Sequence, residues 1–227
     1  MKSNLTRRGL LTSTLAAAAL APLKVARAQP IETAAACILM PEQTLGPYYL
    51  ADELIRSDIR EGKPGVPLAL RLLVLDARTC RPIPLAAVDV WQCDAAGAYS
   101  GFGDSHRFLR GIQLTDRNGI AQFHTIFPGC YPGRTNHIHF QVRTAGAVTG
   151  ETYRGGHVAH TGQVFFPEEI TLRLMQRRDY AARSRERMTQ DEDGIFQRQG
   201  GQASTARLTA ADGGGFEAAL VAAVDNS

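Results

Sequence analysis

The sequence lacks the short motifs of several large enzyme classes. It contains no G-x-G-x-x-G and no G-x-x-x-x-G-K-[ST], so neither a dinucleotide-binding fold nor a P-loop is indicated. It contains no C-x-x-C and no H-E-x-x-H, which argues against a thiolate zinc site and a zinc protease. The one long apolar stretch, residues 10–23, is too short and too rich in alanine to be a good membrane span.

The chain also has little net charge once its first residues are set apart. Its 227 residues include 25 basic and 22 acidic side chains, a formal charge of +3. Residues 1–28 hold five of the basic side chains and no acid, so the remainder carries −2. No basic surface for nucleic acid is therefore indicated. The hydrophobic fraction of 44% is ordinary for a globular protein with a buried core.

Residues 1–28 have the three parts of an export signal. Arg7-Arg8 belongs to a basic start, an apolar middle follows, and Ala26-Arg27-Ala28 is an A-x-A cleavage pattern. The stretch Thr6-Arg7-Arg8-Gly9-Leu10-Leu11 resembles a twin-arginine motif, and that route carries folded proteins. An ordinary secretory signal is the alternative. We predict a periplasmic or secreted mature chain without a membrane span.

Four cysteines follow the predicted signal, and an oxidising compartment permits disulfides among them. Four cysteines allow three full pairings, and the sequence does not choose among them. We favour Cys37–Cys80, because both lie in loop-like, proline-flanked stretches. Cys93 lies within a strand pattern, where it reads as a small buried hydrophobe, and Cys130 lies in a Gly/Pro-rich loop.

The rest of the chain divides into a loop-rich N-terminal arm, residues 29–66, and a β-domain with a C-terminal tail, residues 67–227. Six stretches have strand patterns: residues 68–75, 85–93, 109–114, 120–126, 136–143 and 162–166. Their spacing and Gly/Pro turns predict an all-β, antiparallel sandwich. A helix is predicted from Pro167 and the acids after it through residues 170–187. In the tail, residues 195–196 and 218–224 each suit a strand or a short helix.

Two histidines in the strand pattern of residues 136–143 are candidate metal ligands. Side chains alternate between the faces of a strand, so His137, His139 and Gln141 share one face while apolar residues take the other. The two imidazoles are then close enough to bind one ion. A polar strand face with two hydrogen-bonded histidines is an equally good reading of H-x-H alone.

Two tyrosines in Gly-rich loops, Tyr99 and Tyr131, could complete such a site. A phenolate is a hard anionic donor and would favour Fe(III) over softer divalent metals. A cupin-like site would need a carboxylate soon after the histidines, but no acid follows until Glu151. Taken singly, each tyrosine also suits an ordinary loop or core-edge position.

Several stretches, in order, resemble the intradiol ring-cleavage dioxygenases, non-haem Fe(III) enzymes that open catechols between their two hydroxyls. They span roughly residues 38–166 and are Leu45-Gly46-Pro47-Tyr48-Tyr49, Val90-Trp91-Gln92-Cys93-Asp94-Ala95, Gly97-Ala98-Tyr99-Ser100, Phe108-Leu109-Arg110-Gly111, Thr115-Asp116, Thr125-Ile126-Phe127-Pro128-Gly129-Cys130-Tyr131 and Gly133-Arg134-Thr135-Asn136-His137-Ile138-His139. Two positions depart from similar sequences: Leu45 stands where Glu is common, and Cys130 where a large residue such as Trp is common.

The resemblance implies both a site and a reaction. The implied metal ligands are Tyr99, Tyr131, His137 and His139, with Tyr131 the one that leaves iron when substrate binds. Arg134 matches the arginine that faces the substrate, and Gln163 matches a pocket glutamine. The implied reaction inserts both atoms of O2 into a catechol-type ring to give a cis,cis-muconate-type product.

The resemblance also bears on partners and on competing hypotheses. Family tendency favours a homo-oligomer, although the N-terminal part is too short for the helical dimerisation segment of catechol 1,2-type enzymes. Three alternatives stay open: a non-catalytic, transthyretin-like extracellular binding protein, a cupin-like metal oxygenase, and a degenerate subunit that works only beside a partner.

Overall fold

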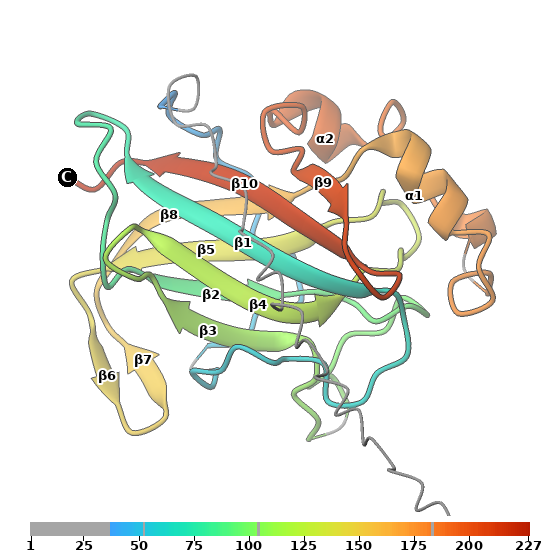
Figure 1. The fold of residues 1–227 in the computed structure, drawn as a ribbon, viewed down its shortest axis with the longest axis horizontal. Helices are drawn as coiled ribbons and strands as arrows, with labels where there is room; N and C mark the ends of the chain where they lie inside the picture. The colour runs from blue at the N-terminus through green and yellow to red at the C-terminus, as the bar shows by residue number, and fades with distance from the viewer. Residues whose placement is uncertain (1–36, 52, 104, 183) are drawn as a thin grey trace, which may run out of the picture. The chain divides into compact units, whose positions relative to one another are not determined.

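Two four-stranded sheets form most of the fold (Figure 1). The computed structural model describes residues 37–51, 53–103, 105–182 and 184–227, so the predicted export signal lies outside the described residues. The strands are β1 (Pro67–Asp76), β2 (Ala87–Trp91), β3 (Arg110–Leu114), β4 (Ile120–Ile126), β5 (Ile138–Thr144), β6 (Ala147–Thr149), β7 (Thr152–Arg154), β8 (His157–Val164), β9 (Arg207–Ala210) and β10 (Phe216–Val224). The helices are α1 (Glu168–Leu174), α2 (Gly194–Arg198) and a 3-10 turn, η1 (Ser184–Glu186).

The sheets have the strand orders β4-β1-β10-β9 and β3-β2-β5-β8, and β6 and β7 pair as a separate hairpin. Apolar side chains from both sheets meet in one buried core, including Leu72 from β1, Val90 from β2 and Phe140 from β5. Burying the facing sides of two sheets is what defines a sandwich, so the predicted fold class is confirmed.

One strand pairing differs from a purely antiparallel pattern. β1 and β10 run parallel, with Leu68 opposite Phe216 and Asp76 opposite Val224. Parallel neighbours need a long connection, and here nearly the whole domain lies between them. The stretch 218–224, left open between strand and helix, is therefore part of a central strand.

The predicted helix of residues 170–187 is shorter than expected, because α1 ends at Leu174. The chain then turns so that Tyr180 is fully buried, and its hydroxyl donates to Phe127 O and accepts from Val66 N, both at 2.9 Å. This anchor directs the chain back to the sheets, an interaction that helical spacing does not reveal. The prediction also missed β6, β7 and β9, and β8 starts earlier than expected.

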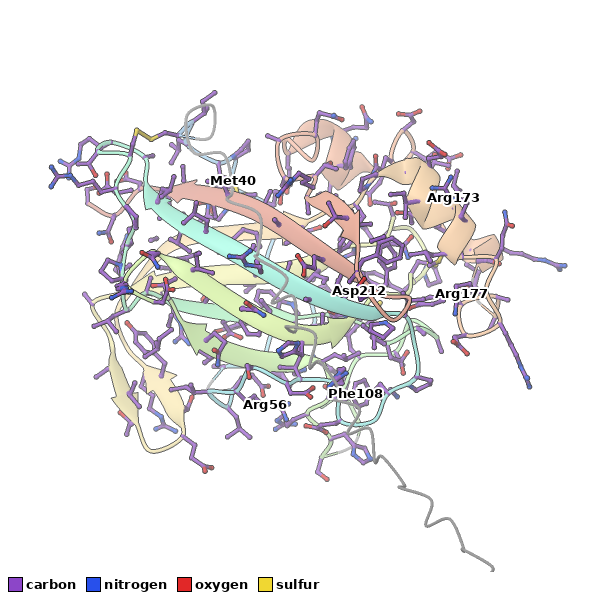
Figure 2. All side chains as sticks on the ribbon, viewed as in Figure 1. Met40, Arg56, Phe108, Arg173, Arg177 and Asp212 are labelled. Atoms are coloured by element: carbon purple, nitrogen blue, oxygen red, sulfur yellow. A yellow bond between two sulfur atoms is a disulfide. The ribbon has the colours of Figure 1, made fainter. Side chains whose placement is uncertain are left out.

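The arm crosses the outer face of the sheet β3-β2-β5-β8. Gln43 N bonds Thr161 O at the β8 edge, and Arg56 N bonds Ile112 O at the β3 edge. Earlier in the arm, Met40 N bonds Ala223 O, and Met40 lies beside β10 in Figure 2. The segment between the two sheet edges therefore covers the face that carries the H-x-H histidines.

The disulfide Cys37–Cys80 is present and ties the arm to the loop after β1 (Figure 2). The favoured pairing is thus confirmed. Cys93 is buried and outside the disulfide, as expected, and Cys130 is buried as well. None of the helices in the described part of the chain is long and apolar enough to cross a membrane.

Candidate metal centre

The two histidines of the H-x-H motif meet at the start of β5. Ile138, Phe140 and Val142 point into the core, while His139 lies on the opposite, outer face. His137 directly precedes the strand, and its Nε2 lies 3.1 Å from Nε2 of His139. Two imidazole nitrogens therefore converge on one point, as strand alternation predicts.

The two candidate tyrosines lie at the same point. The Tyr131 hydroxyl is 3.3 Å from Nε2 of His137, and the Tyr99 and Tyr131 rings are 5.8 Å apart. The Tyr99 hydroxyl is buried and has no hydrogen-bond partner among the described residues. A buried, unpaired hydroxyl is costly unless something else binds it. The four candidate ligands thus lie together, and the Tyr99 hydroxyl oxygen is available to bind a metal ion.

The neighbours of each imidazole orient its lone pair. Nδ1 of His137 donates to the carbonyl oxygen of Thr135 at 2.7 Å, so the neutral ring has a free lone pair on Nε2. His139 stacks on Trp91, with centroids 5.0 Å apart and planes 4° from parallel. These contacts fix both Nε2 atoms toward the centre.

Burial determines the protonation of the four side chains. Desolvation lowers the pKa of His137 and His139 well below the usual value, so both imidazoles are neutral at neutral pH. Desolvation raises the pKa of Tyr99 and Tyr131, so neither phenol ionises without a nearby cation. Two neutral nitrogen donors and two phenols that a cation could ionise fit a trivalent, oxygen-preferring metal.

The donor set differs from common carboxylate and thiolate centres. Within the described ranges, no three His, Cys, Asp or Glu side chains are grouped so that they could hold a metal ion. The nitrogen donors here come from two histidines, and the remaining donors are phenolic oxygens. A metal ion at this point would therefore need the phenolic oxygens of Tyr99 and Tyr131 as ligands beside the two imidazoles.

Arg134 and Gln163 lie on one side of the centre. The Arg134 Nη1 is 3.4 Å from the Tyr131 hydroxyl and 3.3 Å from Nε2 of His137. Arg134 Nη2 donates to Oε1 of Gln163 at 2.5 Å. Gln163 is opposite His139 in the β5–β8 pairing. Both residues suggested by resemblance are therefore at the site.

The arm supplies an aromatic wall. Tyr48 stacks on Tyr99 at 4.2 Å between centroids and meets Tyr131 edge-on at 5.6 Å. Beside it, Gly46 has φ +72°, and a Cβ there would lie 2.9 Å from Cε1 of His139. The glycine allows the arm to approach the imidazole closely.

Sequence reasoning missed one buried residue of the site, Asp193. Its Oδ2 accepts from Nε of Arg134 at 2.9 Å, although the two residues are 59 positions apart. An Asp before Gly194-Ile195-Phe196 could have indicated a helix N-cap. Nothing local could have indicated its partner.

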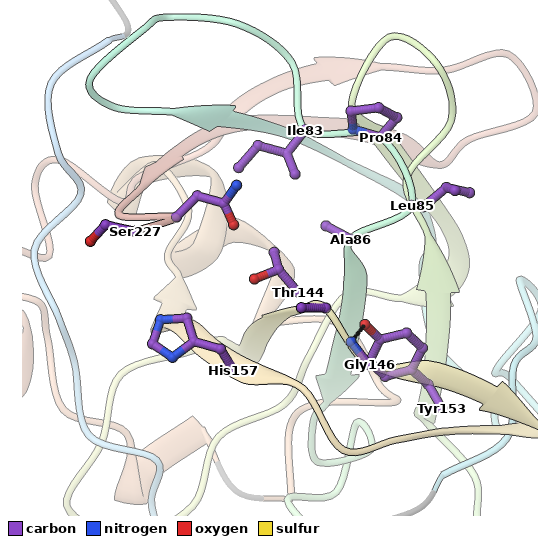
Figure 3. Close-up of a pocket in the computed structure, with 11 residues that line it drawn as sticks. Ile83, Pro84, Leu85, Ala86, Thr144, Gly146, Tyr153, His157 and Ser227 are labelled. Carbon is purple, nitrogen blue, oxygen red and sulfur yellow. Dashed lines mark hydrogen bonds between the residues drawn. The ribbon is translucent and has the colours of Figure 1, made fainter.

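A separate cavity of about 500 Å³ lies at the other end of the same sheet, where β2 begins and β5 ends (Figure 3). Its lining includes Leu85, Tyr153 and His157, and the Tyr153 hydroxyl accepts from Gly146 N at 2.7 Å. None of the four candidate ligands lines it, so it is not part of the metal centre.

Known proteins to which this chain is similar are described as dioxygenases. The family model described as Dioxygenase matches residues 45–168. The protocatechuate 3,4-dioxygenase beta chain of Burkholderia cepacia is 36% identical over 115 residues, 44% of this chain and 48% of that protein. Catechol 1,2-dioxygenase of Candida albicans is 31% identical over 128 residues, 45% of this chain and 42% of that protein. The chain thus spans about half the length of the curated relatives it matches.

Solved structures match over more of the chain. An intradiol ring-cleavage dioxygenase from Tetranychus urticae has a TM-score of 0.76 at 37% identity, covering 83% of this chain and 95% of that chain. The dioxygenase domain of a carbohydrate-binding fusion protein from Streptomyces sp. SirexAA-E has a TM-score of 0.61 at 29% identity, covering 83% and 99%. A match over 83% of the chain includes the sandwich and extends past residue 168, where the family-model region ends.

Proposed function

The chain belongs to the family of intradiol ring-cleavage dioxygenases, and on that premise we propose that it inserts both atoms of O2 into a catechol-type ring, using a non-haem Fe(III) ion, to give a cis,cis-muconate-type product. One observation carries the proposal. His137 Nε2 lies 3.1 Å from His139 Nε2 and 3.3 Å from the Tyr131 hydroxyl. The buried Tyr99 hydroxyl has no hydrogen-bond partner among the described residues, and its ring lies 5.8 Å from that of Tyr131.

The residues that would hold the metal are Tyr99, Tyr131, His137 and His139. Bound Fe(III) would supply a Lewis acid that withdraws electron density from a chelated catecholate and makes its ring reactive toward O2. The side chains prepare the centre for this ion, since the imidazoles are neutral and the phenol oxygens become anionic donors beside a cation.

Tyr131 and Arg134 have distinct roles in the proposed reaction. Tyr131 is half-buried whereas Tyr99 is buried, so Tyr131 is the phenol that can turn away when substrate enters. Its Oη would then accept a proton from a substrate hydroxyl. The Arg134 guanidinium, 3.4 Å from that oxygen, would stabilise negative charge that develops on the ring. Gln163 holds the guanidinium by its Oε1.

Tyr48 and Trp91 place aromatic surfaces around the candidate ligands. Tyr48 packs against both candidate tyrosine ligands, and Trp91 backs His139. These aromatic surfaces suit a flat ring and exclude bulk water from the reacting atoms. The proposed small-molecule partners are a catechol and O2. We further propose that the exported protein forms a homo-oligomer, which light scattering of the purified protein would test.

Iron content, colour and oxygen uptake test the proposed function. Protein loaded with iron is expected to show a visible phenolate-to-Fe(III) absorption band and to consume O2 with at least one member of a catechol panel. Tyr131→Phe should shift the band and lower turnover by about 100-fold or more. Tyr153→Phe is the matched control, because Tyr153 lines the separate cavity, and it should change neither. Colourless protein that binds zinc and never takes iron would contradict the proposal.

A further inference from the structure

We propose that Asp193 is a positioning residue that holds the Arg134 guanidinium against the metal centre. The inference rests on the proposed function for its kinetic consequence only. Its structural part concerns this chain's own side chains, and it assigns a role to a residue beyond the region that the family model matches, residues 45–168.

The first observation is the burial and bonding of Asp193. Its side chain is fully buried and accepts four hydrogen bonds. Oδ1 accepts from the backbone N–H groups of Ile195 at 2.8 Å and Phe196 at 3.2 Å, which caps α2. Oδ2 accepts from Nε of Arg134 and from the backbone N–H of Thr135, both at 2.9 Å. Oδ1 thus caps α2, and Oδ2 binds the Arg134 side chain and the backbone next to it.

The second observation is that capping alone does not require a carboxylate. Serine and asparagine cap helices about as well as aspartate does. A buried guanidinium, by contrast, needs an anionic partner, because an unpaired buried charge is strongly destabilising. The Arg134 side chain is 12% exposed, and the Asp193 carboxylate is its partner in the ion pair. The negative charge at position 193 therefore serves Arg134.

The third observation is the direction of the remaining guanidinium N–H groups. With Nε held by Asp193, Nη2 donates to Gln163 and Nη1 faces Tyr131 and His137. A planar guanidinium fixed at two of its nitrogens has its third nitrogen fixed as well. Asp193 and Gln163 together therefore direct Nη1 at the centre.

Neighbouring contacts hold the same loop without touching the guanidinium. Arg187 donates from Nε to Oδ1 of Asn136 at 2.6 Å and from Nη2 to Oγ1 of Thr135 at 2.8 Å. Met188 N also bonds the Arg134 carbonyl oxygen at 3.3 Å. The segment 187–193 thus fixes the backbone around Arg134, and Asp193 is the member that reaches its side chain.

The deciding variant is Asp193→Ser, which keeps a capping oxygen but is uncharged and too short to reach Arg134. Asp116→Asn is the control, because Asp116 also accepts from backbone N–H groups, in the β3–β4 turn, and forms no ion pair with a guanidinium among the described residues. In metal-free protein labelled at the arginine Nε, we expect the Arg134 Nε–H to exchange with water about tenfold faster or more in Asp193→Ser. The control should match the wild type.

A double-mutant cycle on metal-free protein, followed by the melting temperature, tests the same ion pair independently. In the wild type, Asp193→Ser should lower the melting temperature, because Arg134 loses its partner. In an Arg134→Ala background, the same change should lower it less or raise it, because Asp193 is then a buried charge without its cation. Equal effects in both backgrounds, or an unchanged Nε–H exchange rate in Asp193→Ser, would overturn the inference whatever the activity.

The kinetic consequence is a split between kcat and KM. In iron-loaded protein, Asp193→Ser should lower kcat on a catechol about 10- to 100-fold, change KM less, and leave the visible band in place, since Asp193 does not contact the four candidate ligands. If the wild type cleaves no catechol, the proposed function fails while the exchange and stability results still decide the role of Asp193.

Discussion

At the scale of single residues, the centre depends on where lone pairs and N–H groups point. The Thr135 carbonyl selects one tautomer of His137, and Trp91 sets the plane of the His139 ring. The arm can pass close to His139 because Gly46 has no side chain at that point. Small changes at these positions should alter the centre without altering its ligands.

Gly46→Ala should therefore damage the centre specifically. The alanine would occupy φ +72° and place its Cβ 2.9 Å from the His139 ring. Gly62→Ala is the matched control, with φ +73° and no heavy atom within 4 Å of the added Cβ. Both should lose about 1–2 kcal/mol of stability to backbone strain. Only Gly46→Ala should lower iron content and turnover, by about tenfold or more. Similar iron binding in both variants would contradict this account.

Asp89 is a second residue whose surroundings decide its chemistry. It is buried in β2, and desolvation raises its pKa to about 8. Nη2 of Arg143 lies 3.7 Å from its Oδ2, too far for a hydrogen bond, so this cation lowers the pKa less than burial raises it. The nearby Glu53 carboxylate adds to the upward shift. Asp89 is thus mostly protonated in the folded protein at neutral pH.

This predicts a pH dependence of stability with a definite sign. Between about pH 4 and about pH 8, Asp89 keeps a proton in the folded protein that it releases in the unfolded chain. The free energy of unfolding therefore falls as the pH rises through this range. Asp89→Asn should flatten the decline, measured as free energy of unfolding in urea at about pH 5 and 8. Asp58→Asn is the control, because the Arg60 bond lowers the Asp58 pKa to about 2, outside this window. A slope unchanged by Asp89→Asn would refute the assignment.

At the scale of elements, β5 separates core from site by alternation alone. Its apolar residues fill the sandwich while His139 faces the arm, so the strand cannot shift by one residue without burying the imidazole in the core. The loop before it, residues 128–136, is held closed by Asn136, whose Nδ2 donates to Pro128 O and Gly129 O, both at 2.9 Å. Tyr131 and Arg134 therefore approach His137 from a supported loop.

The Cys37–Cys80 disulfide anchors the arm to the loop after β1. Cys37 and Cys80 are separated by 43 positions, and a crosslink of that span contributes about 2–4 kcal/mol by restricting the unfolded chain. The double variant Cys37→Ser with Cys80→Ser should lower the melting temperature by about 5–15 °C. Reductant should lower the wild type to the same value and leave the variant unchanged. Equal melting temperatures for the oxidised wild type and the variant would show that the bridge adds no stability.

At the scale of the whole molecule, segments far apart in sequence enclose one centre. Gln43 in the arm accepts from Gln163 N on β8 and donates to Oγ of Ser204, while Thr44 N bonds Oε1 of Gln199. The arm and the segment after α2 are thus joined around Gln163. The family-model region, residues 45–168, supplies the candidate ligands, and residues on either side of it bond Gln163 and Arg134 next to them.

Export of the whole chain is a separate proposal, based on residues 1–28. Because a twin-arginine route depends on the arginine pair, changing both Arg7 and Arg8 to Lys should keep the precursor in the cytoplasm of a Gram-negative host. Cell fractionation and mass spectrometry would measure the amount of residues 29–227 in the periplasm. Arg27→Lys, outside the pair, is the control and should be exported. Export of the Lys-Lys variant would instead indicate the ordinary secretory route.

Much of the fold follows from local pattern. Alternation in residues 68–75 and 120–126 predicts β1 and β4, because a strand facing a core needs apolar residues at every second position. The same rule places His137 and His139 together. It does not reveal that β10 runs parallel to β1, nor that the chain turns after Leu174, because both depend on contacts with distant residues.

Local sequence is thus sufficient for β1 to β5 and the end of β8, for the H-x-H face and, through ordered motifs, for the set of candidate ligands. The rest depends on packing. The pairing of Arg134 with Asp193, the contact of Gly46 with His139 and the burial that keeps Asp89 protonated each join residues that are far apart along the chain. A strand pattern reports on neighbours in sequence, whereas desolvation and ion pairing depend on neighbours in space, which exist only once the arm and the tail close over the sheet.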